Sequence, residues 1–294
     1  MFPISKFDWN GFACPIPVMK PFEAAALADQ ILRFQHEEPE KAARAFGTNT
    51  HLLFPSLCAV IQREQILDAV EQVLGRNLLL WSASFFIKRP KTNSFVSWHQ
   101  DSTYWGLEPP EIVTAWLALT PSNRENGCME VVPGSHLRGQ VSHHDTFGDE
   151  NMLSRGQKVS VDISQEKTEA IELEAGQMSL HHVRIFHGSK PNPTDIPRIG
   201  FAMRFIPTQV KQKGGRTFAV LVRGQDVFNN FDRPTLPRAE LGAAEWEMHQ
   251  ESLKRMNTVL FNDAAQATKV KGHQILKTGE QFSPEKKKAE DQYN

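Results

Sequence analysis

The sequence predicts a mainly β protein, a sandwich or barrel, with helices before and after the sheets. The middle of the chain consists of many short apolar runs, as expected for the strands of such a fold. Turn signals such as Glu125-Asn126-Gly127 separate neighbouring runs. Helical segments do not alternate with these runs, which argues against a parallel doubly wound sheet. The runs are residues 78–90, 112–119, 128–133, 169–173, 178–186, 199–206 and 217–222.

Helical segments are expected on both sides of the β region. Residues 21–37 begin with a proline, which the first turn of a helix tolerates, and continue with an amphipathic pattern. Residues 63–75 show apolar positions three and four apart and stop at a glycine. We therefore expect one domain over 1–280 and a polar tail at 281–294. Within the domain we expect a helical part at 21–75, a β core at 78–222 and a C-terminal helical part at 238–262.

Charge and cysteine content narrow the possible functions. Lys and Arg number 33 and Asp and Glu number 34, so nothing favours nucleic acid or an anionic membrane as a partner. We expect no signal peptide and no membrane-spanning helix, because no run reaches the roughly 18 apolar residues of a span. Three scattered cysteines fit a reducing compartment. These features predict a cytoplasmic protein with neither nucleic acid nor a membrane as its partner, and they leave its oligomeric state open.

A histidine and a carboxylate stand two positions apart in the segment Trp98-His99-Gln100-Asp101. Side chains two apart in a strand point to the same face, so His99 and Asp101 can bind one metal ion together. One more histidine would complete the facial triad of non-haem iron oxygenases. His187 follows 86 residues later, after several short strands that let the chain return to the same pocket. The alternative is a hydrogen-bonded core histidine and an aspartate that caps a loop.

The segment after His187 contains a candidate anion-binding arginine. Two prolines and an asparagine typical of a tight turn follow His187, so we expect residues 199–206 to lie antiparallel beside its strand. Arg198 would then lie near the pocket, where its planar guanidinium suits a carboxylate. Ser189 can donate a hydrogen bond to the same carboxylate. Arg204, on the same face of the strand, is a rival for this role, although an ordinary structural partner is the simpler interpretation.

Other histidines compete for the third metal position. His182 lacks the Gly-Ser pair and the spaced arginine that follow His187, so we interpret it as a neighbour of the metal site or a packing residue. His143 and His144 stand in a polar stretch and are expected at the pocket mouth or in solvent. The two further competitors are His136 and His181.

The order and spacing of these motifs resemble those of the phytanoyl-CoA dioxygenase-like family of Fe(II)/2-oxoglutarate-dependent oxygenases. The resemblance rests on WHQD, on the run TAWLALTPSNRENGCMEVVPGSH at 114–136, and on HGS followed by Asn and Arg, and it covers residues 86–206. It implies a double-stranded β-helix core, of the jelly-roll or cupin-like kind. It also implies iron(II) held by His99, Asp101 and His187, and 2-oxoglutarate held by Arg198 and Ser189 beside Trp116.

The resemblance further implies a dioxygenase that consumes O2 and 2-oxoglutarate and releases succinate and CO2. Halogenating relatives carry a small residue in place of Asp101, so we expect hydroxylation. The balanced charge shows no basic groove for coenzyme A. Tyr104 and Trp105 either line the substrate pocket or simply pack, and together with Trp116 they can receive a cation. We expect a small polar metabolite, such as an amino acid, a betaine or an aminophosphonate. The alternatives are a non-catalytic cupin-like metal-binding protein, a zinc hydrolase, or the same oxygenase chemistry on an acyl-CoA or natural-product scaffold.

Overall fold

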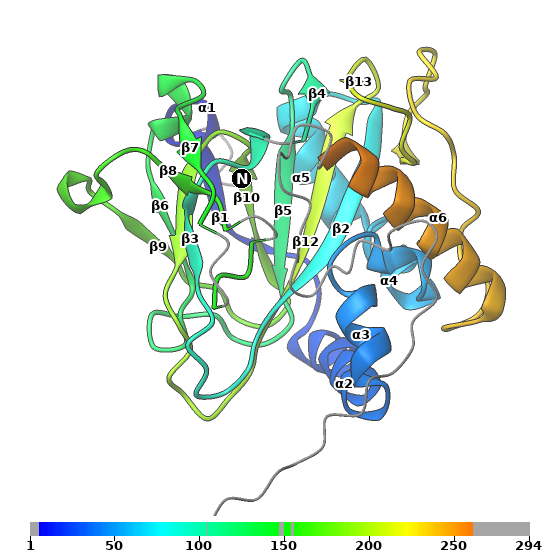
Figure 1. The fold of residues 1–294 in the computed structure, drawn as a ribbon, viewed down its shortest axis with the longest axis horizontal. Coiled ribbons are helices and arrows are strands. Elements are labelled where there is room, and N and C mark those ends of the chain that lie inside the picture. Colours follow the sequence, from blue (N-terminus) through cyan, green and yellow to red (C-terminus); the bar gives the residue numbers. More distant parts are fainter. Residues whose placement is uncertain (1–5, 104, 147–149, 154–155, 261–294) are drawn as a thin grey trace, which may run out of the picture.

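In the computed structural model, two antiparallel sheets face one another and helices cover the outer face of the larger sheet (Figure 1). The structure describes residues 6–103, 105–146, 150–153 and 156–260. The six-stranded sheet has the order β1-β10-β5-β12-β2-β14, and the four-stranded sheet has the order β3-β11-β6-β9. Two short pairs, β13 with β4 and β7 with β8, complete the described strands.

The strands of the larger sheet are β1 (Phe12–Pro17), β2 (Leu78–Lys88), β5 (Val113–Ala118), β10 (Gln177–His182), β12 (Arg198–Pro207) and β14 (Val220–Arg223). Those of the smaller sheet are β3 (Val96–His99), β6 (Met129–Val132), β9 (Glu169–Ile171) and β11 (Phe186–Ser189). The short pairs are β4 (Leu107–Glu108), β7 (His143–His144), β8 (Lys158–Val159) and β13 (Lys211–Gln212). The α-helices are α1 (Phe7–Asn10), α2 (Pro21–Glu37), α3 (Pro39–Ala45), α4 (Pro55–Val60), α5 (Glu64–Leu74) and α6 (Ala243–Leu260).

Strand β12 is the central element of the larger sheet. It pairs with β2 from Arg198 opposite Lys88 to Pro207 opposite Leu78, and with β5 along its other edge. All of its residues are buried. A strand covered on both faces has an almost continuous apolar sequence, which explains why the run 199–206 does not alternate.

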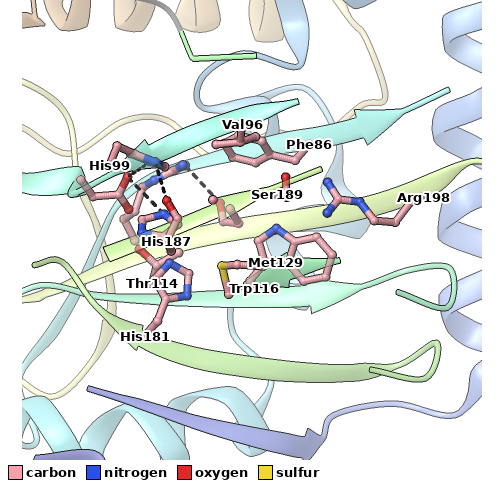
Figure 2. A pocket seen from close by; sticks show the side chains of 14 residues that line it. Phe86, Val96, His99, Thr114, Trp116, Met129, His181, His187, Ser189 and Arg198 are labelled. Atoms are coloured by element: carbon pink, nitrogen blue, oxygen red, sulfur yellow. Dashed lines mark hydrogen bonds and ion pairs between the residues drawn. The ribbon is translucent and has the colours of Figure 1, made fainter. Parts of the chain in front are cut away.

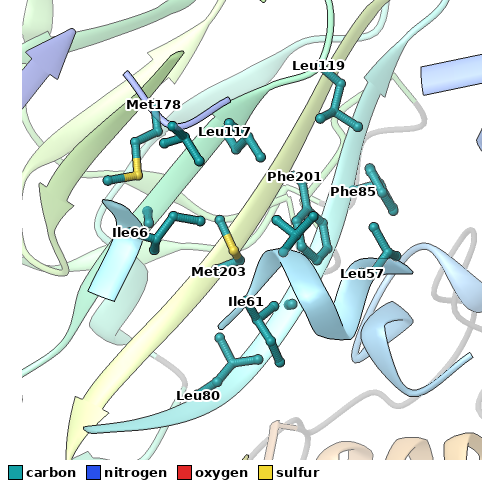
Figure 3. Packing of buried hydrophobic residues seen from close by; sticks show 14 of the residues in the cluster. Leu57, Ile61, Ile66, Leu80, Phe85, Leu117, Leu119, Met178, Phe201 and Met203 are labelled. Atoms are coloured by element: carbon teal, nitrogen blue, oxygen red, sulfur yellow. The ribbon is translucent and has the colours of Figure 1, made fainter. Parts of the chain in front are cut away.

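The outer face of the six-stranded sheet carries the main apolar core (Figure 3). Leu117 of β5 and Phe201 and Met203 of β12 pack there with Leu57 of α4 and Ile66 of α5. All five side chains are fully buried. Burial of side chains of this size stabilises the fold by about 1.5–3 kcal/mol each. This face therefore anchors the sheet whose opposite face looks toward the smaller sheet.

Most of the predicted elements are present. Helices α2 and α5 coincide with the segments expected at 21–37 and 63–75, and α6 falls within 238–262. The run 178–186 instead forms two strands, because the chain turns after His182, whose carbonyl accepts the N–H of Ile185 at 3.0 Å. The polar tail expected at 281–294 lies outside the described residues. Among the helices that the structure describes, none is long and apolar enough to cross a membrane.

The segment after His187 crosses to the other sheet, so the predicted pairing of 199–206 with the His187 strand is wrong. Strand β11 pairs with β3 and β6, whereas β12 lies between β2 and β5. The side-chain amide of Asn192 donates to the carbonyls of Ile196, at 2.8 Å, and Lys88, at 3.3 Å. These bonds tie the connection to the end of β2. As a result, Arg198 approaches the space between the sheets from the side opposite His187.

Candidate metal centre and cosubstrate pocket

A pocket between the two sheets contains most of the residues singled out in the sequence (Figure 2). It holds about 420 Å³ of space, its open mouth included. Strands β3, β6 and β11 contribute one wall, and strands β2, β5, β10 and β12 contribute the other. The lining residues are Phe86, Val96, His99, Asp101, Thr114, Trp116, Met129, His181, His187, Gly188, Ser189, Arg198, Ala202 and Arg204.

The three side chains predicted to bind a metal meet at one end of this pocket. Strand β3 ends at His99, and Asp101 opens a short 3-10 helix instead of continuing the strand. His187 lies opposite His99 on β11. The Oδ1 atom of Asp101 is 3.2 Å from Nε2 of His99 and 3.9 Å from Nε2 of His187. In the described part of the chain, these are the three His, Cys, Asp or Glu side chains whose potential ligand atoms all lie within 4.8 Å of one another.

The hydrogen bonds of the two histidines direct their Nε2 lone pairs toward Asp101. Nδ1 of His99 is 2.8 Å from the carbonyl oxygen of Ser97, and Nδ1 of His187 is 3.1 Å from that of Ile185. A carbonyl only accepts, so each Nδ1 carries a proton and a neutral ring has a bare acceptor at Nε2. Two such lone pairs and a carboxylate therefore converge. A divalent cation would relieve their repulsion, so this donor set fits iron(II).

The charge states of the site also suit a metal. Burial alone would raise the pKa of the Asp101 carboxyl, but the His99 and His187 rings, when they are protonated, and the charge of Arg204 outweigh it and hold this pKa well below its usual range. Burial lowers the pKa of His187 well below its ordinary value, and the nearby His99 adds to the effect. At neutral pH Asp101 is thus ionised and His187 neutral, the forms in which these side chains bind metals.

Arg198 lies at the other end of the pocket as a buried cation. Its side chain is 2% exposed, and its Nη1 donates to the carbonyl of Gly127 at 3.0 Å. Its Nε is buried without a hydrogen-bond partner, and no Asp or Glu carboxylate among the described residues acts on its charge. Burial lowers the pKa of the guanidinium to about 10, so it stays charged at neutral pH. A bound carboxylate would supply the missing counter-ion with bidentate geometry.

Trp116 and Ser189 border the space in front of Arg198 (Figure 2). The guanidinium carbon is 5.2 Å from the centre of the Trp116 ring. Gly200 makes this arrangement possible, because a Cβ atom there would lie 1.9 Å from the indole. Ser189 belongs to β11 and therefore reaches the space from the opposite sheet. The structure thus brings together the three residues that the family resemblance connects with 2-oxoglutarate.

Lys88 is a buried residue of this region that the sequence did not reveal. Its side chain is fully buried at the end of β2, and its Nζ lies 2.6 Å from Oγ of Ser189 and 3.1 Å from the carbonyl of Gly127. It also donates to the carbonyl of Lys190. Lys88 and Arg198 therefore share the Gly127 carbonyl. Burial, together with the charge of Arg198, lowers the pKa of Lys88 to about 6. A lysine at a strand end, next to an arginine and two positions before a proline, is normally interpreted as exposed, so no sequence signal indicated this role.

The structure also separates the competing histidines. His181 lines the pocket, with its ring centre 5.0 Å from that of His187. The adjacent His182 faces away, as alternation along a strand requires, and its ring packs 5.1 Å from that of His136. Of the two interpretations of His182, packing therefore describes its position. The remaining two, which do not line the pocket, are His143 and His144.

Of the two aromatic residues predicted for the substrate pocket, the structure describes only Trp105. Tyr104 lies outside the described residues. The ring centre of Trp105 lies 5.4 Å from the guanidinium carbon of Arg204 and 5.2 Å from the ring centre of Trp81. Trp105 lines a second pocket, which meets the first at Phe86, Asp101 and Arg204. Its contact with substrate stays a prediction.

Comparison with known proteins decides the family. Residues 7–200 match the sequence model described as phytanoyl-CoA dioxygenase. The chain belongs to the phytanoyl-CoA dioxygenase family. The matched range contains His99, Asp101, His187 and Arg198 and ends before Arg204. The resemblance inferred from the sequence is therefore confirmed at the level of the family.

Individual relatives show the same class. A probable alpha-ketoglutarate-dependent hypophosphite dioxygenase of Stutzerimonas stutzeri is 31% identical over 52% of this chain and 55% of that protein. An ectoine dioxygenase of Nocardia farcinica (strain IFM 10152) is 24% identical over 69% of this chain and 76% of that protein. The matches with the first three curated relatives span 55%, 61% and 60% of their lengths.

A solved structure confirms the jelly-roll fold. The non-heme monooxygenase ThoJ in its apo form superimposes with a TM-score of 0.79 at 30% identity. The superposition covers 88% of this chain and 97% of the ThoJ chain. The prediction of a double-stranded β-helix with flanking helices is therefore correct.

Proposed function

We propose that this chain is an iron(II)- and 2-oxoglutarate-dependent dioxygenase that hydroxylates an unactivated C–H bond of a small polar metabolite. The observation that carries the proposal is one pocket with two complementary ends. At one end, His99, Asp101 and His187 direct acceptor atoms at a common point. At the other, Arg198 is a buried cation without an acidic partner among the described residues. A dicarboxylate that bridges a metal and an arginine satisfies both ends.

Each residue has a distinct task in this proposal. His99, Asp101 and His187 would hold iron(II) and leave three coordination positions open. Arg198 and Ser189 would bind the distal carboxylate of 2-oxoglutarate through charge-assisted hydrogen bonds. When bound, iron(II) and 2-oxoglutarate supply the oxidising chemistry, in which 2-oxoglutarate is decarboxylated to succinate and one oxygen atom of O2 enters the substrate. The protein excludes water with apolar walls and orients the substrate C–H bond.

Asp101 favours hydroxylation over halogenation. With iron(II) bound, its carboxylate would take the position that chloride needs, and its charge would oppose a second anion there. With labelled O2 and chloride in the buffer, mass spectrometry of the product should show one labelled oxygen and no chlorine. A chlorinated product, or one that lost hydrogen without gaining oxygen, would refute this part of the proposal.

The proposed substrate class rests on the balanced charge of the chain, which shows no basic groove for coenzyme A. An amino acid, a betaine or an aminophosphonate combines a compact polar group with aliphatic C–H bonds. Two relatives are named for hypophosphite and ectoine, both small polar molecules. The free thiols of Cys14, Cys58 and Cys128 fit a reducing compartment, and we propose the cytoplasm as the site of the reaction.

A succinate-release screen tests the function. Purified protein is incubated with iron(II), ascorbate, 2-oxoglutarate and a panel of small polar metabolites. At least one of them should raise succinate formation above the uncoupled rate. Asp101→Ala is the matched control and should remove both rates. Equal succinate release by Asp101→Ala, or turnover with zinc in place of iron, would contradict the proposal and favour an adventitious or hydrolytic activity.

A further inference from the structure

A second pocket adjoins the candidate metal centre. It holds about 710 Å³ of space, open solvent included. Phe86, Asp101 and Arg204 line both pockets, so the second pocket begins where the candidate metal centre ends. Its walls come from β2, from the segment around Met152 and from α6. The lining residues are Gly47, Thr48, Trp81, Ser82, Ser84, Phe86, Asp101, Trp105, Met152, Leu153, Gln157, Arg204, Met256, Asn257 and Leu260.

Arg204 is a buried cation at the boundary of the two pockets. Its side chain is 8% exposed, and its Nη1 donates to Oγ of Ser84 at 2.6 Å and to the carbonyl of Ala202 at 3.4 Å. Its Nε is buried and has no hydrogen-bond partner among the residues that the structure describes. Asp101 acts on it electrostatically, but within the described part of the chain no carboxylate lies within 4.0 Å of the guanidinium. A buried guanidinium with free donor capacity is costly unless a ligand completes it.

The charges of the two pockets point to an anion. Asp101 is the one acidic side chain among the described residues that line either pocket, and Arg198 and Arg204 are the two cations. Iron(II) adds two positive charges and 2-oxoglutarate two negative charges. With both bound and Arg198 paired with 2-oxoglutarate, the centre keeps one uncompensated positive charge, which lies at Arg204. A substrate with one negative charge would make the assembled centre neutral.

The other residues that line the second pocket indicate which further groups such a ligand carries. Trp81, Trp105 and Met256 offer apolar surface. On another wall, Gln157 is 8% exposed, and its Oε1 is buried without a hydrogen-bond partner in the described part of the chain, so it can accept from an N–H or O–H group. The pocket thus combines a cation, an acceptor and an apolar surface. This combination suits a small organic acid that also carries a donor group.

We propose that the second pocket receives the primary substrate and that this substrate carries an oxyanion, a carboxylate or a phosphonate, bound by Arg204. This assignment rests on the proposed function, because it places a C–H bond near the metal site only if His99, Asp101 and His187 hold iron. It gives the two buried arginines of β12 separate ligands, with 2-oxoglutarate on Arg198 and the substrate on Arg204. The alternative is that Arg204 serves only to keep Asp101 ionised.

Matched probes test the assignment. Protein loaded with Ni(II) and saturating 2-oxoglutarate, which cannot turn over, is titrated by calorimetry with carboxylates and phosphonates of three to six carbons and with the amide of each carboxylate. At least one anion should bind at least about tenfold more tightly than its neutral counterpart. The carboxylate and phosphonate arms identify which oxyanion the site prefers. Equal binding of anions and amides, or no binding of any anion, would overturn the assignment.

Two arginine variants separate the roles. Arg204→Gln should lose the preference for anions while its affinity for 2-oxoglutarate, measured in the same protein, stays within about threefold. Arg198→Gln, the matched control on the same strand face, should lose affinity for 2-oxoglutarate instead. Arg204→Lys keeps the charge and should retain part of the anion preference, which serves as the test if Arg204→Gln folds poorly. An Arg204→Gln protein that keeps its anion preference, or that loses 2-oxoglutarate as Arg198→Gln does, contradicts the assignment. If the wild type binds no 2-oxoglutarate with the metal, the proposed function itself fails.

Discussion

The two faces of strand β12 have opposite chemistry although they share one backbone. On the outer face, Ile199, Phe201, Met203 and Phe205 belong to the main apolar core under the helices. On the inner face, three of the alternate residues line the pocket between the sheets: Arg198, Ala202 and Arg204. The comparison shows that one strand can both anchor the fold and hold buried charges. The burial of apolar side chains on the outer face offsets the free-energy cost of burying the two arginines on the inner face. Substitutions on the two faces should therefore have different consequences.

The largest effect is expected at the metal end of the pocket that the inner face of β12 lines, where Asp101 approaches from the 3-10 helix after β3. Asp101→Ala removes a carboxylate from the candidate metal site, and 2-oxoglutarate turnover should fall by more than about 100-fold, since even indirect supports of metal ligands have effects of about 10–100-fold. Circular dichroism should show an unchanged fold. A variant with wild-type turnover, or one that unfolds, would break the distinction between the two faces.

A substitution on the outer face should lower the stability of the fold and leave ligand binding almost unchanged. Phe201→Ala removes a fully buried ring packed 4.9 Å from Phe85 and should lower the free energy of unfolding by about 3–5 kcal/mol. Denaturant unfolding measures this loss. Metal and 2-oxoglutarate affinities of the folded fraction should stay within a few-fold of wild type. Met203→Leu conserves volume and serves as the mild control, with an expected loss of less than about 1.5 kcal/mol.

At the cosubstrate end, Arg198→Ala should weaken 2-oxoglutarate binding by about 2–3 kcal/mol, or roughly 30- to 150-fold, because a charge-assisted bidentate contact is lost. Calorimetry with the metal-loaded protein measures it. The same substitution also leaves the Gly127 carbonyl with one donor fewer, so a parallel unfolding curve is needed to show that the protein remains folded. Unchanged affinity would move the anchor to Arg204.

The smallest predicted effect is a pH dependence that comes from Lys88. Its pKa is about 6 in the folded protein because of burial, against an ordinary value of 10.5. Between these two pH values the unfolded chain binds the extra proton, so the stability of the wild type should rise as pH increases through this window. Below pH 6 the lysine is protonated in both states and the contribution is flat. Lys88→Met should lack this rise, and denaturant unfolding at pH 6.5, 7.5 and 8.5 compares the two. Parallel pH curves would contradict the prediction.

Strand β12 and its neighbours show which features of the fold and the site the sequence could predict. The alternation rule placed Arg198 and Arg204 on one face, and the HxD spacing brought His99 and Asp101 together. Spacing along the chain, however, determines the face of a strand and not the sheet that the strand joins. For this reason the sequence mispredicted the partner of 199–206, which the Asn192 hydrogen bonds direct across to the other sheet.

Contacts between segments that are distant in the sequence could not be predicted either. The burial of Lys88 depends on three acceptors from two loops and a strand, and the isolation of the Arg204 charge depends on which carboxylates the fold keeps away from it. Neither property belongs to a local pattern. The sequence could therefore identify the candidate metal ligands but not the second pocket or the lysine behind Arg198.

The central claim is that His99, Asp101 and His187 bind iron(II) in the pocket where Arg198 anchors 2-oxoglutarate. Anaerobic addition of iron(II) and then 2-oxoglutarate to the wild-type protein should produce a weak visible metal-to-ligand charge-transfer band. His187→Ala should lose both this band and iron affinity, whereas Arg198→Ala should retain iron and require more 2-oxoglutarate for the same band. A His187→Ala protein that keeps the band at full iron affinity would contradict the assignment.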